Sequence, residues 1–379
     1  MADLQSRALF QLSASLGREW PNIKRAHEET EAAKKDLLAL LTREVGEKFL
    51  SEDTNLVVFG SMGRSEWIDW RSDLDWTFLI DGQCKPLHFQ IAQEIQAGLK
   101  KECRKNAEGK LEYRFAEPGP TGTFGNMGFS HHLIHLIGGQ EDTNKNTTQR
   151  ILLLLESVAL GPGGAHGRVL KEIVQRYLDE EPHLVNKSHD RFKVPRFLLN
   201  DIVRFWRTMA VDFANKQRDR GGEGWGLRNA KLRMSRKLIF AAGLLTCFSC
   251  QLDEELQTHI STDRSDIKSA RSLDLLHLQD HIRRRVSLTP LDCVASAMSE
   301  YKIEPSVAAE LFTAYDNFLE MMSDIGKREH LKKLKAEHSR EDPVFREVEN
   351  FSERFSSALA QIFFGNHRLG PLTQKYGVF

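Results

Sequence analysis

Two aspartates separated by a single residue are the side chains of this sequence best suited to chemistry. Asp73-Leu74-Asp75 opens an apolar run, Trp76 to Ile80, that is typical of a buried strand. Side chains two residues apart on a strand point the same way, so Asp73 and Asp75 share a face. Paired carboxylates repel each other unless a cation lies between them, and hard divalent ions such as Mg²⁺, or Mn²⁺ in its place, suit them. The spacing therefore predicts a metal site at Asp73 and Asp75.

A second feature lies just upstream. Leu56 to Phe59 is a short apolar run that predicts a buried strand, and Gly60 and Ser61 end it. A turn at this point presents backbone N–H groups, the Ser61 hydroxyl and the Arg64 guanidinium. Such donors suit the phosphates of a nucleoside triphosphate.

Together the two features resemble the signature of the DNA polymerase β-type nucleotidyltransferase superfamily: a strand, Gly-Ser, eleven intervening residues, then Asp-x-Asp on a strand. The alternative is a plain turn followed by two surface aspartates that begin a strand. The spacing and the two flanking strands favour the nucleotidyltransferase interpretation. The resemblance covers about residues 50 to 145 and implies an α+β fold with a small mixed sheet.

Composition restricts the other possibilities. The chain has 379 residues, enough for two or three domains, and its 53 basic and 53 acidic residues balance. Cys247 and Cys250 form a C-x-x-C within an apolar run without a second ligand pair, so we expect core thiols rather than zinc or redox chemistry. No apolar run is long enough to span a membrane, and we expect a soluble, cytoplasmic protein.

The periodicity predicts a division into four parts. We expect an N-terminal helical segment over 1–50, a nucleotidyltransferase core over 51–145, an all-helical domain over 146–365 and a flexible tail over 366–379. Within the core, Pro86 to Lys105 predicts an amphipathic helix with its apolar side formed by Phe89, Ile91, Ile95 and Leu99.

The resemblance implies a third carboxylate on a further strand. Lys110 to Phe115 alternates apolar and polar residues, as a strand does, and Glu112 lies on its polar side. We favour Glu112 as the third metal ligand, with Glu117 as the alternative. If neither serves, Glu141 or Asp142 is the next candidate. The glycine-rich stretch Pro118 to Gly128 is a loop that could approach a ligand closely.

Three histidines follow that loop, at positions 131, 132 and 135. Without a matching acidic ligand we expect them on a helix surface and in the core rather than at a metal. The stretch from these histidines to the apolar helix ending at Glu156 is weakly similar to uridylyltransferases that modify PII signal proteins.

A basic helix is predicted downstream. Over RNAKLRMSRKL, Arg228, Lys231 and Ser235 share one helical face, and Arg233 and Lys237 share another. The stretch carries no acidic residue, which favours contact with a polyanion over a merely solvated face. The resemblance implies that Arg228 or Lys231 assists the incoming triphosphate.

The resemblance also implies two-metal nucleotidyl transfer, with a nucleoside triphosphate as donor and pyrophosphate as leaving group. The acceptor hydroxyl could belong to a nucleotide, to a nucleic acid such as a tRNA end, or to a protein. We favour template-independent synthesis of a nucleotide signal, as in bacterial anti-phage nucleotidyltransferases. A catalytically dead module that binds nucleotide is a further alternative. The other expected partners are a second copy of the chain or an effector protein, and not a membrane.

A last candidate lies near the C-terminus. Tyr376 has glycine and proline neighbours, so a flexible tail could carry its hydroxyl to the metal site as an acceptor. The alternative is that Tyr376 anchors the tail by packing.

Overall fold

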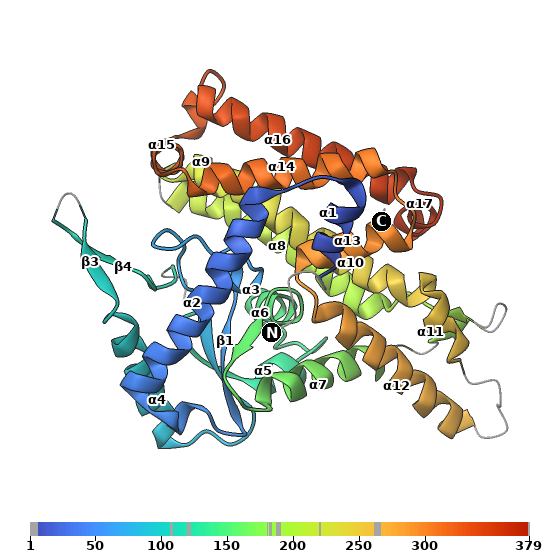
Figure 1. Ribbon diagram of the computed structural model, residues 1–379. Helices are drawn as coiled ribbons and strands as arrows, with labels where there is room; N and C mark the ends of the chain where they lie inside the picture. The colour runs from blue at the N-terminus through green and yellow to red at the C-terminus, as the bar shows by residue number, and fades with distance from the viewer. Residues whose placement is uncertain are drawn as a thin grey trace. The chain divides into compact units, whose positions relative to one another are not determined.

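The computed structural model describes residues 7–106, 109–119, 123–179, 181, 184–186, 191–219, 221–260 and 267–377 (Figure 1). They form two compact units: a sheet unit, residues 25–180, and a helical unit, residues 1–24 with 181–379. The α+β class is confirmed. The division differs from the expected one, because the sheet unit also contains most of the N-terminal helix and the chain from 146 to 180.

The sheet unit is built on a mixed four-stranded sheet in the order β5-β2-β1-β6. Its strands are β1 (Thr54–Val58), β2 (Trp76–Ile80), β5 (Asn126–Phe129) and β6 (Val158–Leu160). β1 is antiparallel to β2 and β6, and β2 is parallel to β5. The pairing of β6 with β1 is why the core extends beyond residue 145.

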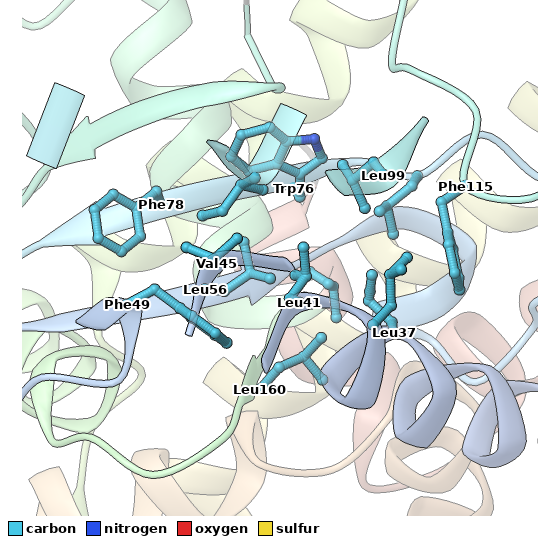
Figure 2. Close-up of a cluster of buried hydrophobic side chains, with 14 of the residues drawn as sticks. Leu37, Leu41, Val45, Phe49, Leu56, Trp76, Phe78, Leu99, Phe115 and Leu160 are labelled. Atoms are coloured by element: carbon cyan, nitrogen blue, oxygen red, sulfur yellow. The ribbon is translucent and has the colours of Figure 1, made fainter. Parts of the chain in front are cut away.

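One face of this sheet is covered by α2 (Pro21–Val45) and α4 (Pro86–Leu99). Figure 2 shows Leu37 and Leu41 of α2 in one buried cluster with Trp76 and Phe78 of β2. These side chains and Leu99 of α4 are each at most 2% exposed, which makes this face the main apolar core of the sheet unit.

The apolar stripe of α4 was predicted with one error. Ile91, Ile95 and Leu99 are buried as expected, but Phe89 is 55% exposed and His88 takes its place in the core. At 100° per residue, position 88 is in phase with 91 and 95, whereas 89 is not. The helix also ends at Leu99, before the predicted Lys105.

The opposite face of the sheet is covered by α5 (Ser130–Ile134), α6 (Asn144–Leu155) and α7 (Ala165–Asp179). Because side chains alternate along a strand, Thr77 and Leu79 of β2 point to this face while Trp76 and Phe78 point into the core. The hydrogen bond from the Phe59 N–H to the Asp75 carbonyl oxygen continues the β1–β2 ladder by one position, so the same alternation places Asp75 on the α5 and α6 face.

A separate hairpin, β3 (Cys103–Lys105) with β4 (Leu111–Tyr113), projects from the sheet unit (Figure 1). The strand predicted at Lys110 to Phe115 is therefore present, but it belongs to a two-stranded sheet of its own.

The helical unit consists mainly of helices packed on one another. Its helices are α1 (Ala8–Leu16), α8 (Arg196–Asp219), α9 (Trp225–Lys231), α10 (Lys237–Leu252), α11 (Glu254–Thr258), α12 (Ile267–Val286), α13 (Pro290–Glu300), α14 (Pro305–Ser323), α15 (Ile325–Lys333), α16 (Pro343–Ala360) and α17 (Leu369–Leu372). It is not all-helical as expected, because β7 (Val185–Asn186) and β8 (Arg191–Phe192) form a small antiparallel ribbon. Among the described residues, no helix is long and apolar enough to cross a membrane.

The structure shows the state of the C-x-x-C cysteines and of the C-terminal segment. Cys247 and Cys250 are fully buried core thiols, as predicted, and burial raises the pKa of both. The segment expected to be a flexible tail is instead helical: α17 is followed by a π-helical turn, Thr373–Gly377. Leu369 and Leu372 are buried there, and this apolar burial holds the segment in place.

Candidate nucleotide site

The site begins where β1 and β2 lie next to each other. The Phe59 N–H donates to the Asp75 carbonyl oxygen at 2.8 Å, which sets Gly60 beside Asp75. Gly60 has a φ of +63°, and a Cβ at this position would lie 2.6 Å from Asp75 Oδ2. Only glycine satisfies both constraints, because other residues would be strained at this φ and would displace the carboxylate.

The two aspartates differ in exposure although they share a face. Asp75 is half-buried at the start of β2, and Asp73 is exposed. Leu74 between them is buried, and its N–H donates to the Ala116 carbonyl oxygen at 2.9 Å. This arrangement holds the Asp-x-Asp backbone, and the Asp75 carboxylate lies against Gly60.

A cavity of about 300 Å³ opens on that same side. Thr77, Leu79 and Asn126 line its floor, and Lys145 and Gln149 of α6 line its wall. This volume is at the lower end of the range for small-molecule sites.

The mouth of the cavity has a pair of aromatic rings. The Phe59 and Phe124 rings lie 4.9 Å apart at an interplanar angle of 42°, and both line the cavity. Carboxamides of Asn126, Asn146 and Gln149 add donors and acceptors. Such a lining can hold a flat, polar heterocycle such as a nucleobase.

Asn126 is a site residue that the sequence did not reveal. It pairs with Thr77 across the parallel β2 and β5 strands, so it stands on the face of Asp75 and Thr77. The signal lay in the stretch after Gly125, where Asn126–Phe129 forms a strand inside what was predicted to be a loop.

Arg64 does not point to a ligand. It is buried, its Nε donates to Glu66 at 2.9 Å, and its Nη1 is paired with Glu156. The guanidinium joins α3 (Gly60–Gly63) to the end of α6, and a phosphate contact by Arg64 stays a prediction. Ser61 is half-buried within α3, next to Gly60.

The predicted third carboxylates are engaged elsewhere. Glu112 lies on the β3–β4 hairpin and is paired with Arg71 at 2.7 Å and Arg104 at 2.8 Å. Glu117 is exposed and paired with Lys100 at the end of α4, the helix on the core face of the sheet. Neither geometry supports the role predicted for these glutamates.

The structure also gives no support to the two remaining candidates for the third metal ligand. Asp142 is buried and paired with Arg150 at 2.8 Å, and Glu141 is exposed before α6. Within the described ranges, no three His, Cys, Asp or Glu side chains come together as a metal cluster. The binding of Mg²⁺ by Asp73 and Asp75 stays a prediction; Mg²⁺ is often held by only one or two carboxylates together with water and substrate phosphates.

The remaining predicted residues lie on or beside helices. His131, His132 and His135 are exposed on and just after α5, and His132 lines the cavity. Arg228 and Lys231 are half-buried in α9, and their predicted contact with a triphosphate stays a prediction.

Tyr376 is half-buried in the π-helical turn, with Lys375 Nζ 5.0 Å from its ring centroid. Within the described residues, the segment expected to be flexible is thus helical, and the acceptor role of Tyr376 stays a prediction.

Comparison with models of known protein families and with curated protein sequences finds no match. The assignment of function therefore depends on the residues themselves.

Proposed function

We propose that the protein is a metal-dependent nucleotidyltransferase that moves an NMP or dNMP from a nucleoside triphosphate to a hydroxyl acceptor. The observation that supports this most strongly is the placement of Asp75 against Gly60, with a nucleoside-sized cavity lined by their neighbours Phe59 and Thr77. A bare strand start would need neither the positive φ of Gly60 nor the close carboxylate.

Each part of the site has a distinct task in this proposal. Asp73 and Asp75, with the Asn126 oxygen, would hold Mg²⁺, which when bound neutralises the triphosphate and lowers the pKa of the acceptor hydroxyl. The Gly60-Ser61 turn faces the phosphates. The Phe59 and Phe124 rings receive a base, and the Lys145 ammonium at the cavity edge attracts phosphate.

The acceptor we favour is a second nucleotide, as in synthesis of a nucleotide signal for anti-phage defence. This preference comes from the resemblance of the Gly-Ser and Asp-x-Asp elements to bacterial anti-phage nucleotidyltransferases. A cytoplasmic location belongs to the same proposal, since it supplies nucleoside triphosphates.

The direct test is incubation of the purified protein with each α-labelled NTP and dNTP, with Mg²⁺ and with EDTA. A small labelled product that requires Mg²⁺ is the expected result. A labelled protein band or a labelled, extended tRNA would support nucleotidyl transfer but would show that the acceptor is a protein or a tRNA instead. Nucleotide binding without turnover under all conditions would favour the inactive module.

A further inference from the structure

The helical unit contains a polar hollow that the proposed function does not use. It measures about 450 Å³ and is lined by Arg233, Lys237, Ser352, Ser356 and Ser357, with Glu353 at its rim. Arg233 lies in the turn that joins α9 to α10, Lys237 is the first residue of α10 one helical turn later, and the serines come from α16.

The two cations are held in place by hydroxyl groups. Arg233 Nη1 donates to Ser352 Oγ at 3.3 Å, and Lys237 Nζ donates to Ser356 Oγ at 2.7 Å. The serine protons are directed elsewhere, since Ser352 donates to the Glu349 carbonyl and Ser356 to the Ser352 carbonyl. Both serines therefore act as acceptors that orient the cations.

No acid neutralises this pair in the part of the chain that the structure describes. Neither Arg233 nor Lys237 forms an ion pair there, and the exposed Glu353 stays beyond ion-pair distance of both. The neighbouring Arg354 is itself paired with Glu310. Two positive charges thus share a hollow in which each retains N–H donors for a ligand.

The pair is costly to the protein when no ligand is bound. Burial, and then the charge of Arg233, lower the pKa of Lys237. Arg233 is further fixed by the Phe345 ring, whose centroid lies 5.9 Å from its Cζ. The chain between the cations is a π-helical turn, Leu232–Arg236, a rare form frequent at functional sites.

We propose that this hollow is a binding site for a phosphoryl group, held by Arg233 and Lys237 and closed by the Ser357 hydroxyl. A phosphate dianion matches the two positive charges. The planar fork of Arg233 and the compact ammonium of Lys237 are complementary phosphate donors. Free phosphate and the phosphates of a nucleotide share this chemistry.

Calorimetric titration with inorganic phosphate, pyrophosphate and ATP, each in EDTA, tests the site. To separate it from the nucleotide site, the titrated protein carries Asp73→Asn and Asp75→Asn, and saturable binding should persist. Adding Lys237→Met should weaken phosphate binding at least about tenfold, because the charge-assisted bond from the Lys237 ammonium to phosphate is lost. The control Lys332→Met, at an exposed lysine of α15, should bind as its parent does.

Thermal unfolding supplies a readout that distinguishes a ligand site from a merely structural lysine. Without phosphate, Lys237→Met should unfold at an equal or higher temperature, because the buried charge and its repulsion by Arg233 are gone. With phosphate, only the parent and the Lys332→Met control should gain stability. Lower stability of Lys237→Met without phosphate, together with unchanged phosphate affinity, would overturn the proposal.

A second variant tests the same site in case Lys237→Met does not fold. Ser357 is exposed, so Ser357→Asp leaves the packing intact and sets a carboxylate against the cations. It should abolish phosphate binding. Phosphate binding equal to that of the parent in Ser357→Asp would contradict the site. Tighter binding of ATP than of both phosphate and pyrophosphate would identify a nucleotide as the source of the phosphoryl group.

Discussion

Among single residues, Gly60 is the one that most tightly constrains the position of Asp75. Its φ is +63°, and Asp75 Oδ2 lies only 2.6 Å from the point that a Cβ would occupy, which leaves room for a hydrogen only. The Gly60 backbone and the Asp75 carboxylate are therefore in close contact, and a side chain added at position 60 should displace the carboxylate.

The variant Gly60→Ala should lose most nucleotidyl transfer, on the order of a hundredfold, because displacing Asp75 disturbs the metal ligands. The left-handed conformation alone would cost about 1–2 kcal/mol of stability. Gly17→Ala is the matched control, since Gly17 has a φ of +58° and no heavy atom within 4 Å of its Cβ position. Equal activity of the two variants in the labelled-nucleotide assay would contradict the fit between Gly60 and Asp75.

A residue-scale prediction of pH dependence concerns His166. Burial lowers its pKa from 6.5 to about 4, and its Nε2 lies 2.7 Å from Ser157 Oγ. The folded protein thus keeps His166 neutral where the unfolded chain protonates it, so stability present above pH 6.5 falls as the pH drops toward 4.

Urea unfolding at pH 7 and pH 5 measures this effect. His166→Gln should lose less stability between the two pH values than the native protein does. His281 is buried with its pKa also lowered to about 4, and it should account for part of the remainder. An unchanged pH dependence in His166→Gln would show that His166 titrates normally.

At the scale of elements, Arg64 joins α3 to the end of α6 through Glu66 and Glu156. Arg64→Ala would remove the guanidinium that pairs with two buried carboxylates, and loss of one member of a buried pair costs about 3–5 kcal/mol. Lys100→Ala, which breaks the exposed pair with Glu117, should cost less than about 1 kcal/mol. Comparable unfolding free energies for both variants in urea would contradict the structural role of Arg64.

The β5 strand and the β3–β4 hairpin make opposite predictions about the third metal-site ligand. Asn126→Ala should lower kcat/KM up to about tenfold, the effect of one lost polar contact. Glu112→Gln should leave kcat/KM within about threefold, because Arg71 and Arg104 already engage that carboxylate. A larger loss of kcat/KM in Glu112→Gln, partly restored by excess Mg²⁺, would show that Glu112 is the third metal ligand.

The same two elements show what the sequence could and could not predict. The strand after Asp-x-Asp and the Gly-Ser turn follow from local patterns, so the sequence alone is enough to propose Asp73, Asp75 and Gly60. The third position depends on which strand pairs with β2, and that pairing is non-local. The alternation of Glu112 with apolar residues predicted a strand correctly but carried no information on its partner strand.

At the scale of the whole molecule, the order of elements predicted the fold class but not the unit boundaries. Helical periodicity marks α6 and α7 as helices, yet only the pairing of β6 with β1 shows that they belong to the sheet unit. The C-terminal segment was misjudged because Gly370 and Pro371 outweighed Leu369 and Leu372, which the fold buries.

The central claim is that Asp73 and Asp75 carry metal-dependent nucleotidyl transfer. Its most direct test is release of pyrophosphate from NTPs and dNTPs with Mg²⁺, comparing the native protein with Asp73→Asn/Asp75→Asn. Asp53→Asn is the matched control, because Asp53 is an exposed carboxylate of the same unit, just before β1. We predict turnover in the native protein and the control and none in the double variant, with all three folded by circular dichroism. Native turnover by the double variant would contradict the account.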